Sequence, residues 1–260
     1  MRVPPDVLFT LPGPLVFAII FGVVASVALL INGVFGRKAG KHAGVEFSKI
    51  NTGVVSVSGA VFGLAMTFLV NTVWNTQDQA NDTVNAEARA IRVMDVYMES
   101  LTGPEHDGLA RLLADYGHAV AVEWDAMGTE GEDMAAEHAL RNLYAAVIKG
   151  LSQGDQNRTL QQRLLPTLDA ISAARQQRLS IAQNYVSSSQ WLLVTVLAIV
   201  LLCIVAGSHA DFPLARRTSL TGVTFAISIL LFVIVMHDRP FLGYDALTPE
   251  PILAAAGALP

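Results

Sequence analysis

Three polar side chains interrupt an apolar stretch near the start of the chain. Thr67, Asn71 and Asn75 follow one another at four-residue spacing, so a helix would place them on one face. They lie in the run from Ile50 to Gln77, which contains no charged residue. A hydroxyl and two amides can present neutral dipoles to water or to a passing ion. The chemistry that these residues could do is therefore ion guidance across an apolar medium.

The same run contains two other sets of residues. The apolar side chains of Phe62, Met66 and Leu69 could form a constriction that excludes water. Residues small enough for close helix packing are Gly22, Ser26, Gly59 and Gly63. Two interpretations remain open: the polar face lines a pore, or it packs within one protomer, where interhelical hydrogen bonds average roughly 0.6 kcal/mol.

A second polar site follows the last apolar run. It is an interfacial motif of four residues, Asp238, Arg239, Pro240 and Phe241. Its carboxylate and guanidinium could pair with another subunit, or with Arg175 or Arg178. The motif then forms either an anion-attracting rim or a helix stop with a packing contact. For Arg175 and Arg178 themselves, we expect interface salt bridges or contacts with lipid headgroups.

Enzyme and metal motifs are absent from the sequence. There is no HExxH, CxxC, GxSxG or P-loop pattern. The six histidines are scattered, and the adjacent Glu137 and His138 do not make a ligand set. The single cysteine, Cys203, lies in an apolar run. We therefore expect no catalysis, no metal and no cofactor, and the net charge of −5 argues against nucleic-acid binding.

The composition is that of an integral membrane protein. Of the 260 residues, 52% are hydrophobic and only 15% are charged, whereas soluble domains have about 25% charged residues. A membrane-spanning helix needs about 20 apolar residues. Four uncharged runs meet this requirement: Val7–Gly36, Ile50–Gln77, Leu179–Ala210 and Thr218–His237. We interpret the first run as a retained membrane span.

Between the second and third spans, residues 77–189 have the periodicity of a helical domain. Its first helix continues the second span, and Thr102–Glu105 forms a capping box that begins the next. The last helix runs into the third span. We predict an all-α integral membrane protein with four transmembrane helices, spans two and three continuing into the domain as long helices. The predicted division is 1–76, with a basic loop at 36–50, then 77–189, then 190–260.

Basic residues predict the orientation. The loop between the first two spans carries Arg37, Lys38, Lys41 and Lys49. Arg216 and Arg217 lie between spans three and four, and short basic loops remain in the cytoplasm. Trp74 and Trp191 then share the outer interface. We expect a multi-pass protein of the inner (plasma) membrane, with both termini and the 77–189 domain extracytoplasmic.

Four segments of the sequence resemble the bestrophin-like family of bacterial membrane proteins, and the resemblance covers nearly the whole chain. DRPF after the last span is the most specific match. The segments are His42–Trp74, EWDAM at Glu123–Met127, SAARQQRL at Ser172–Leu179, and DRPFLG at Asp238–Gly243 with Pro249-Glu250-Pro251 after it.

The resemblance implies a function. Bestrophins are homopentameric anion channels, calcium-gated or constitutive, whose second span lines the pore and whose domain after that span is cytoplasmic. The basic loops here predict the opposite orientation, and the nearest acidic cluster, Glu130–Asp133, is not at the position of a calcium clasp. We expect a homo-oligomeric channel in the lipid bilayer with an anion as its permeant. The alternative is a non-catalytic sensor or scaffold whose outer helical domain binds a partner or ligand.

Overall fold

A computed structural model describes residues 8–9, 11–38, 52–127, 134–150, 155–243 and 246–258. Lys41 and Lys49 of the basic loop and the Glu130–Asp133 cluster lie outside these residues. The chain divides into two compact units, one with residues 1–75, 186–239 and 243–245, the other with the rest. The helices are α1 (Gly13–Lys38), α3 (Thr52–Met98), α4 (Pro104–Met127), α5 (Ala135–Gly150), α6 (Asp155–Ala182), α7 (Ser188–Ser208), α8 (Pro213–His237) and α9 (Glu250–Ala255).

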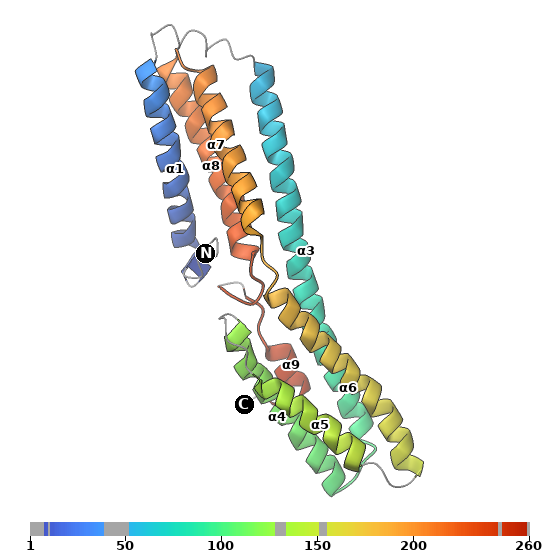
Figure 1. The fold of residues 1–260 in the computed structure, drawn as a ribbon. Coiled ribbons are helices and arrows are strands. Elements are labelled where there is room, and N and C mark those ends of the chain that lie inside the picture. Colours follow the sequence, from blue (N-terminus) through green and yellow to red (C-terminus); the bar gives the residue numbers. More distant parts are fainter. Residues whose placement is uncertain are drawn as a thin grey trace. The chain divides into compact units, whose positions relative to one another are not determined.

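The first unit contains α1, the part of α3 before residue 76, α7 and α8. Helices α1, α7 and α8 contact one another (Figure 1). The Phe17 ring on α1 meets Phe232 on α8 edge to face, with 5.6 Å between ring centroids. At the other end, Arg216 donates to Asn32 Oδ1 at 2.9 Å and to the Ala210 carbonyl at 2.7 Å. These contacts hold α1 and α8 together at both ends.

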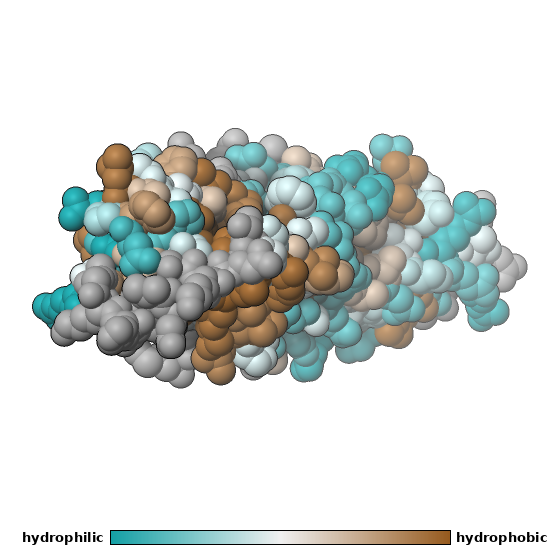
Figure 2. Space-filling model, turned by 90° about the horizontal axis from the view of Figure 1, so that it is seen from above, coloured by the Kyte–Doolittle hydropathy of each residue, from teal (hydrophilic) through white to brown (hydrophobic). Residues whose placement is uncertain are grey.

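The outer faces of this unit are strongly apolar. Leu29, Leu30, Phe68 and Leu192 each expose 65–72% of their surface, and Figure 2 shows broad areas of exposed hydrophobic residues. An apolar surface of this extent needs a nonaqueous partner. Among the described residues, four helices are long and apolar enough to cross a membrane, which confirms the predicted spans: Gly13–Arg37, Gly53–Met98, Ser188–Ser208 and Pro213–His237.

The second unit is a helical bundle around its own core. The continuation of α3 packs with α4, α5 and α6. The fully buried residues of this bundle include Ile91, Met94, Leu143 and Leu168. Gly103, with a φ of +68°, separates α3 from α4. Helix α4 then begins at Pro104, as the capping-box pattern predicted.

The connection between the bundle and the third span corrects one prediction. Span two continues without interruption as α3, but α6 ends at Ala182 and α7 begins at Ser188. Ser187 is the cause, because it forms a capping box with Gln190. The Gln190 side chain accepts from the Ser187 N–H at 2.9 Å, and Ser187 accepts from the Gln190 N–H. A new helix therefore begins where the sequence suggested continuity.

The C-terminal segment packs into the bundle. Helix α9 contacts α4, and Ile252 is fully buried. The closest approach is at Gly117, where an added Cβ would lie 2.8 Å from the Cβ atoms of Ala256 and Ala258. Trp124 Nε1 also donates to the Leu247 carbonyl at 2.9 Å. The tail thus belongs to the second unit, whereas the division by sequence grouped it with the last two spans.

Candidate functional site

The predicted polar row lies on one face of the membrane part of α3. Thr67, Asn71 and Asn75 are all exposed in the single chain. The Thr67 hydroxyl is satisfied within the helix, where it donates to the Gly63 carbonyl at 2.9 Å. The row therefore has the placement that a pore-facing surface requires, and its role remains a prediction.

The predicted constriction lies on the other side of the same helix. Phe62, Met66 and Leu69 expose only 5%, 1% and 4% of their surface. Their helical register places them away from the row containing Asn71. The three side chains are therefore packed within the single chain, and their role as a constriction stays a prediction.

The small residues of the spans make no close contact with another described helix. A Cβ added at Gly22, Gly59 or Gly63 would meet nothing within 4 Å among the described residues. Ser26 donates to the Gly22 carbonyl of its own helix at 2.7 Å. Packing of this small face within one protomer, the second interpretation from the sequence, is therefore not seen.

The interfacial motif caps the end of α8. Asp238 is 3% exposed, and its Oδ1 accepts a hydrogen bond from the Val186 N–H at 2.8 Å. The Arg239 guanidinium lies over the Phe9 ring, 5.0 Å from its centroid. Burial raises the pKa of Asp238 to about 6, although the Val186 N–H and Arg239 act in the opposite direction. The contacts of Asp238 are thus within the first unit, with neither of the arginines proposed from the sequence.

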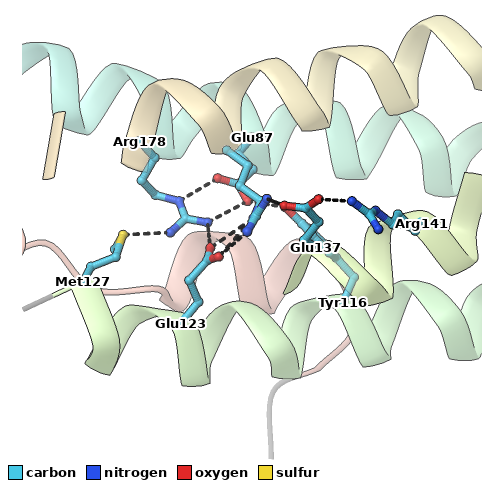
Figure 3. Close-up of polar contacts among 8 residues, drawn as sticks. Glu87, Tyr116, Glu123, Met127, Glu137, Arg141 and Arg178 are labelled. Atoms are coloured by element: carbon cyan, nitrogen blue, oxygen red, sulfur yellow. Dashed lines mark hydrogen bonds and ion pairs between the residues drawn. The ribbon is translucent and has the colours of Figure 1, made fainter. Parts of the chain in front are cut away.

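The second unit contains a buried ionic cluster, defined here as Glu87, Tyr116, Glu123, Arg175 and Arg178 (Figure 3). Arg178 Nε donates to Glu87 Oε2 at 2.9 Å, and its Nη2 donates to Glu123 Oε2 at 3.0 Å. Arg175 Nε donates to Glu123 Oε1 at 3.1 Å. Tyr116 completes the set by donating to Glu87 Oε1 at 2.6 Å. Two acids alternate with two bases across α3, α4 and α6.

Burial makes these contacts mutually dependent. None of the five residues exposes more than 6% of its surface. Burial raises the pKa of Tyr116 well above its ordinary value, and the nearby Glu87 carboxylate adds to this effect. Burial alone would lower the pKa of Arg178, but Glu87, Tyr116 and Glu123 together more than offset this effect and raise it. Arg178 therefore stays charged inside the bundle because its acidic partners are there.

The ionic cluster is enclosed by sulfur and aromatic groups. Arg178 Nη1 lies 3.1 Å from Met127 Sδ, and its guanidinium lies 4.9 Å from the Trp124 ring centroid. The Trp124 ring meets Phe241 edge to face at 5.4 Å. The segments EWDAM and SAARQQRL, which carry part of the family resemblance, thus meet at one guanidinium, and Phe241 of DRPF packs against the Trp124 ring.

This site was missed from the sequence. Arg175 and Arg178 were expected in interface salt bridges or in contact with lipid headgroups, and the structure corrects this because both are buried with glutamates inside the bundle. Their spacing carried a signal, since they follow the apolar positions Leu164, Leu168 and Ile171 at three- and four-residue steps. What the sequence could not show was the acidic partners, which lie 52 to 91 residues away along the chain.

The ionic cluster holds helices together and offers no metal site. No group of three or more His, Cys, Asp or Glu side chains that could hold a metal ion occurs among the described residues. Each carboxylate is already occupied by guanidinium or phenol donors. Its chemistry is the fixing of α6 against α3 and α4 through charge-assisted hydrogen bonds.

Comparison with known proteins supports the resemblance. None of the curated proteins matches the chain significantly. A solved structure of a bacterial Bestrophin homolog from Klebsiella pneumoniae, carrying a point mutation, matches with a TM-score of 0.72 at 10% identity, covering 92% of this chain and 97% of that one. Another structure of that homolog matches with a TM-score of 0.68 at 11% identity, covering 92% and 99%. These likenesses show a shared fold.

The family model describes the same extent of chain. The Bestrophin-like domain matches residues 18–252, from the first span to the C-terminal helix α9. This range includes the polar row, the ionic cluster and the interfacial motif. The chain, a helical protein with four spans, belongs to the Bestrophin-like family.

Proposed function

We propose that this protein is a homo-oligomeric membrane channel that conducts anions, with the polar row of α3 facing the pore. Membership of the Bestrophin-like family and the fold of bestrophin homologs support a channel. The resemblance to bestrophins supports anions as the permeant. The observation that carries the proposal is the exposure of Thr67, Asn71 and Asn75 on a charge-free span.

Contact with lipid is energetically unfavourable for the polar row. Moving an amide from water into an apolar medium without a hydrogen-bond partner costs about 4–8 kcal/mol on alkane scales. Asn71 is exposed on a charge-free, apolar span. Several copies arranged around a water-filled axis would hydrate its amide and that of Asn75.

The scaffold alternative has less support. It requires the polar face of span two to pack against other spans of its own subunit. Instead the row is exposed, and no described neighbour approaches Gly59 or Gly63. A channel makes use of this uncovered face, because in an oligomer the face meets water or a second copy.

Conductance in planar bilayers tests the proposal. The purified protein should carry current, and Asn71→Leu should reduce single-channel conductance severalfold because it removes a dipole from the path. Thr72→Val is the matched control, since Thr72 is also exposed, donates to the Phe68 carbonyl of its own helix, and lies about 100° from Asn71 around the helix. Equal effects of the two variants would contradict the pore face.

The permeant is tested separately. Under a KCl gradient the current should reverse near the chloride equilibrium potential. Reversal near the potassium equilibrium potential would contradict anion selectivity but would still support a channel. A complete absence of current, together with a monomeric mass in detergent, would favour the scaffold.

A further inference from the structure

The junction between the end of α8 and the start of α7 contains a buried carboxylate with an unused oxygen. Asp238 Oδ1 accepts from the Val186 N–H at 2.8 Å, while Oδ2 is buried and has no hydrogen-bond partner among the described residues. Buried polar atoms are normally satisfied, so an exception calls for an explanation. A proton on this second oxygen would neutralise the carboxyl group and so remove the cost of burying a carboxylate there.

The position of Asp238 gives such a proton a structural consequence. Val186 is itself 5% exposed, and it directly precedes Ser187, the N-cap of α7. Its N–H is therefore fixed by the residue that follows α8 in sequence. Any change in the affinity of Asp238 for this buried position changes how the start of α7 is held.

We propose that Asp238 is a proton-operated latch, in which protonation of Oδ2 keeps the side chain in its buried site on Val186 and deprotonation favours its release to water. This goes beyond the proposed channel function and does not depend on it. The charged group that acts on this carboxyl is Arg239, and its neighbour His237 directs Nδ1 to the Val233 carbonyl of α8.

The direction follows from linkage between protonation and conformation. Burial raises the pKa of Asp238 to about 6, whereas a solvated Asp titrates near 3.9. The buried arrangement therefore binds the proton more tightly than the released one. The stability of the buried form relative to the released form is greatest below about pH 4 and falls as the pH rises to about 6. Over this range the equilibrium constant between the buried and released forms changes on the order of 100-fold.

Hydrogen exchange at the Val186 amide measures the latch directly. Full-length protein in nanodiscs would be labelled between pH 4.5 and 8, with rates corrected for intrinsic amide chemistry. Protection of Val186 should fall as pH rises towards 6 and then level off. Asp238→Asn should abolish this pH dependence, because its amide does not titrate but can still accept the N–H.

Three further variants identify the titrating group. Arg239→Gln should move the midpoint to higher pH, because Arg239 lowers the pKa of Asp238, and this readout remains if Asp238→Asn fails to fold. His237→Gln and the exposed Asp211→Asn should leave the profile unchanged. The proposal fails if protection is independent of pH, if the Asn variant keeps the slope, or if His237→Gln removes it.

Discussion

At the scale of single residues, the ionic cluster explains how a helical bundle tolerates buried charge. Arg178 has no exposed surface, yet two carboxylates and an aromatic face surround it. Moving such charges out of water is costly, and only well-placed partners repay this cost. A buried network of this kind adds little net stability, but it penalises any arrangement of helices that separates its members.

Arg178→Met tests this dependence. The methionine fills similar space but leaves Glu87 and Glu123 as buried acids with fewer donors. Breaking a buried pair costs about 3–5 kcal/mol, which corresponds to a fall of about 10 °C in Tm for a chain of this size. Thermal unfolding in detergent, followed by circular dichroism, measures it.

Arg141→Met is the matched control. Arg141 pairs with Glu137 four residues away, and its side chain is 66% exposed, so its loss should cost only about 0.3–0.5 kcal/mol. Adding Glu87→Gln to Arg178→Met should restore part of the lost Tm by removing one unpaired charge. Equal losses for Arg178→Met and Arg141→Met would refute the structural importance of the ionic cluster.

The sequence predicted residue positions better than residue partners. The four-residue spacing of Thr67, Asn71 and Asn75 was enough to place them on one exposed face, because helical periodicity is local. Phe62, Met66 and Leu69 were assigned by hydrophobicity alone, and that property does not distinguish a constriction from a packed face. The partners of Arg178 depend on long-range contacts, about which local patterns carry no information.

At the scale of helices, strong local signals predicted the boundaries. Proline at position 104 after a glycine with positive φ marked the start of α4. The Ser187 capping box was also present in the sequence, but the apolar run around it suggested a continuous span. The packing of α9 on α4 could not be predicted, because it depends on small residues at positions 117, 256 and 258 that meet only in the fold.

Gly117→Ala tests the packing of α9. The new methyl group would lie 2.8 Å from the Cβ atoms of Ala256 and Ala258, closer than van der Waals contact allows. We expect α9 to leave α4, which limited proteolysis would detect as faster cleavage within residues 246–258. Overpacking of this kind costs about 1–3 kcal/mol.

Gly108→Ala is the control on the same helix. A Cβ at Gly108 meets no described atom within 4 Å, so the change should stabilise α4 by roughly 0.5–1 kcal/mol through helix propensity. The two Gly→Ala substitutions should thus change the stability of the protein in opposite directions. If Gly117→Ala were also stabilising and left the tail protected, the close approach of α9 would be wrong.

At the scale of the whole molecule, family and charge distribution predict opposite orientations. The resemblance to bestrophins implies a cytoplasmic domain after span two. The basic residues imply the reverse, because Arg37 lies in the last turn of α1, and Arg216 and Arg217 lie at the start of α8. Short connections rich in Lys and Arg are held in the cytoplasm during insertion. We therefore propose that both termini and the bundle face the periplasm.

A fusion of alkaline phosphatase after Gly131 decides between the two orientations. The enzyme folds only outside the cytoplasm, so it should be active at this position and inactive when fused after Arg217. Replacing Arg37, Lys38, Lys41 and Lys49 by Gln should lower the activity at Gly131, because the charge bias that fixes the topology is then weakened. Activity only after Arg217 would place the bundle in the cytoplasm, as in bestrophins, and would show that the basic loops do not control insertion here.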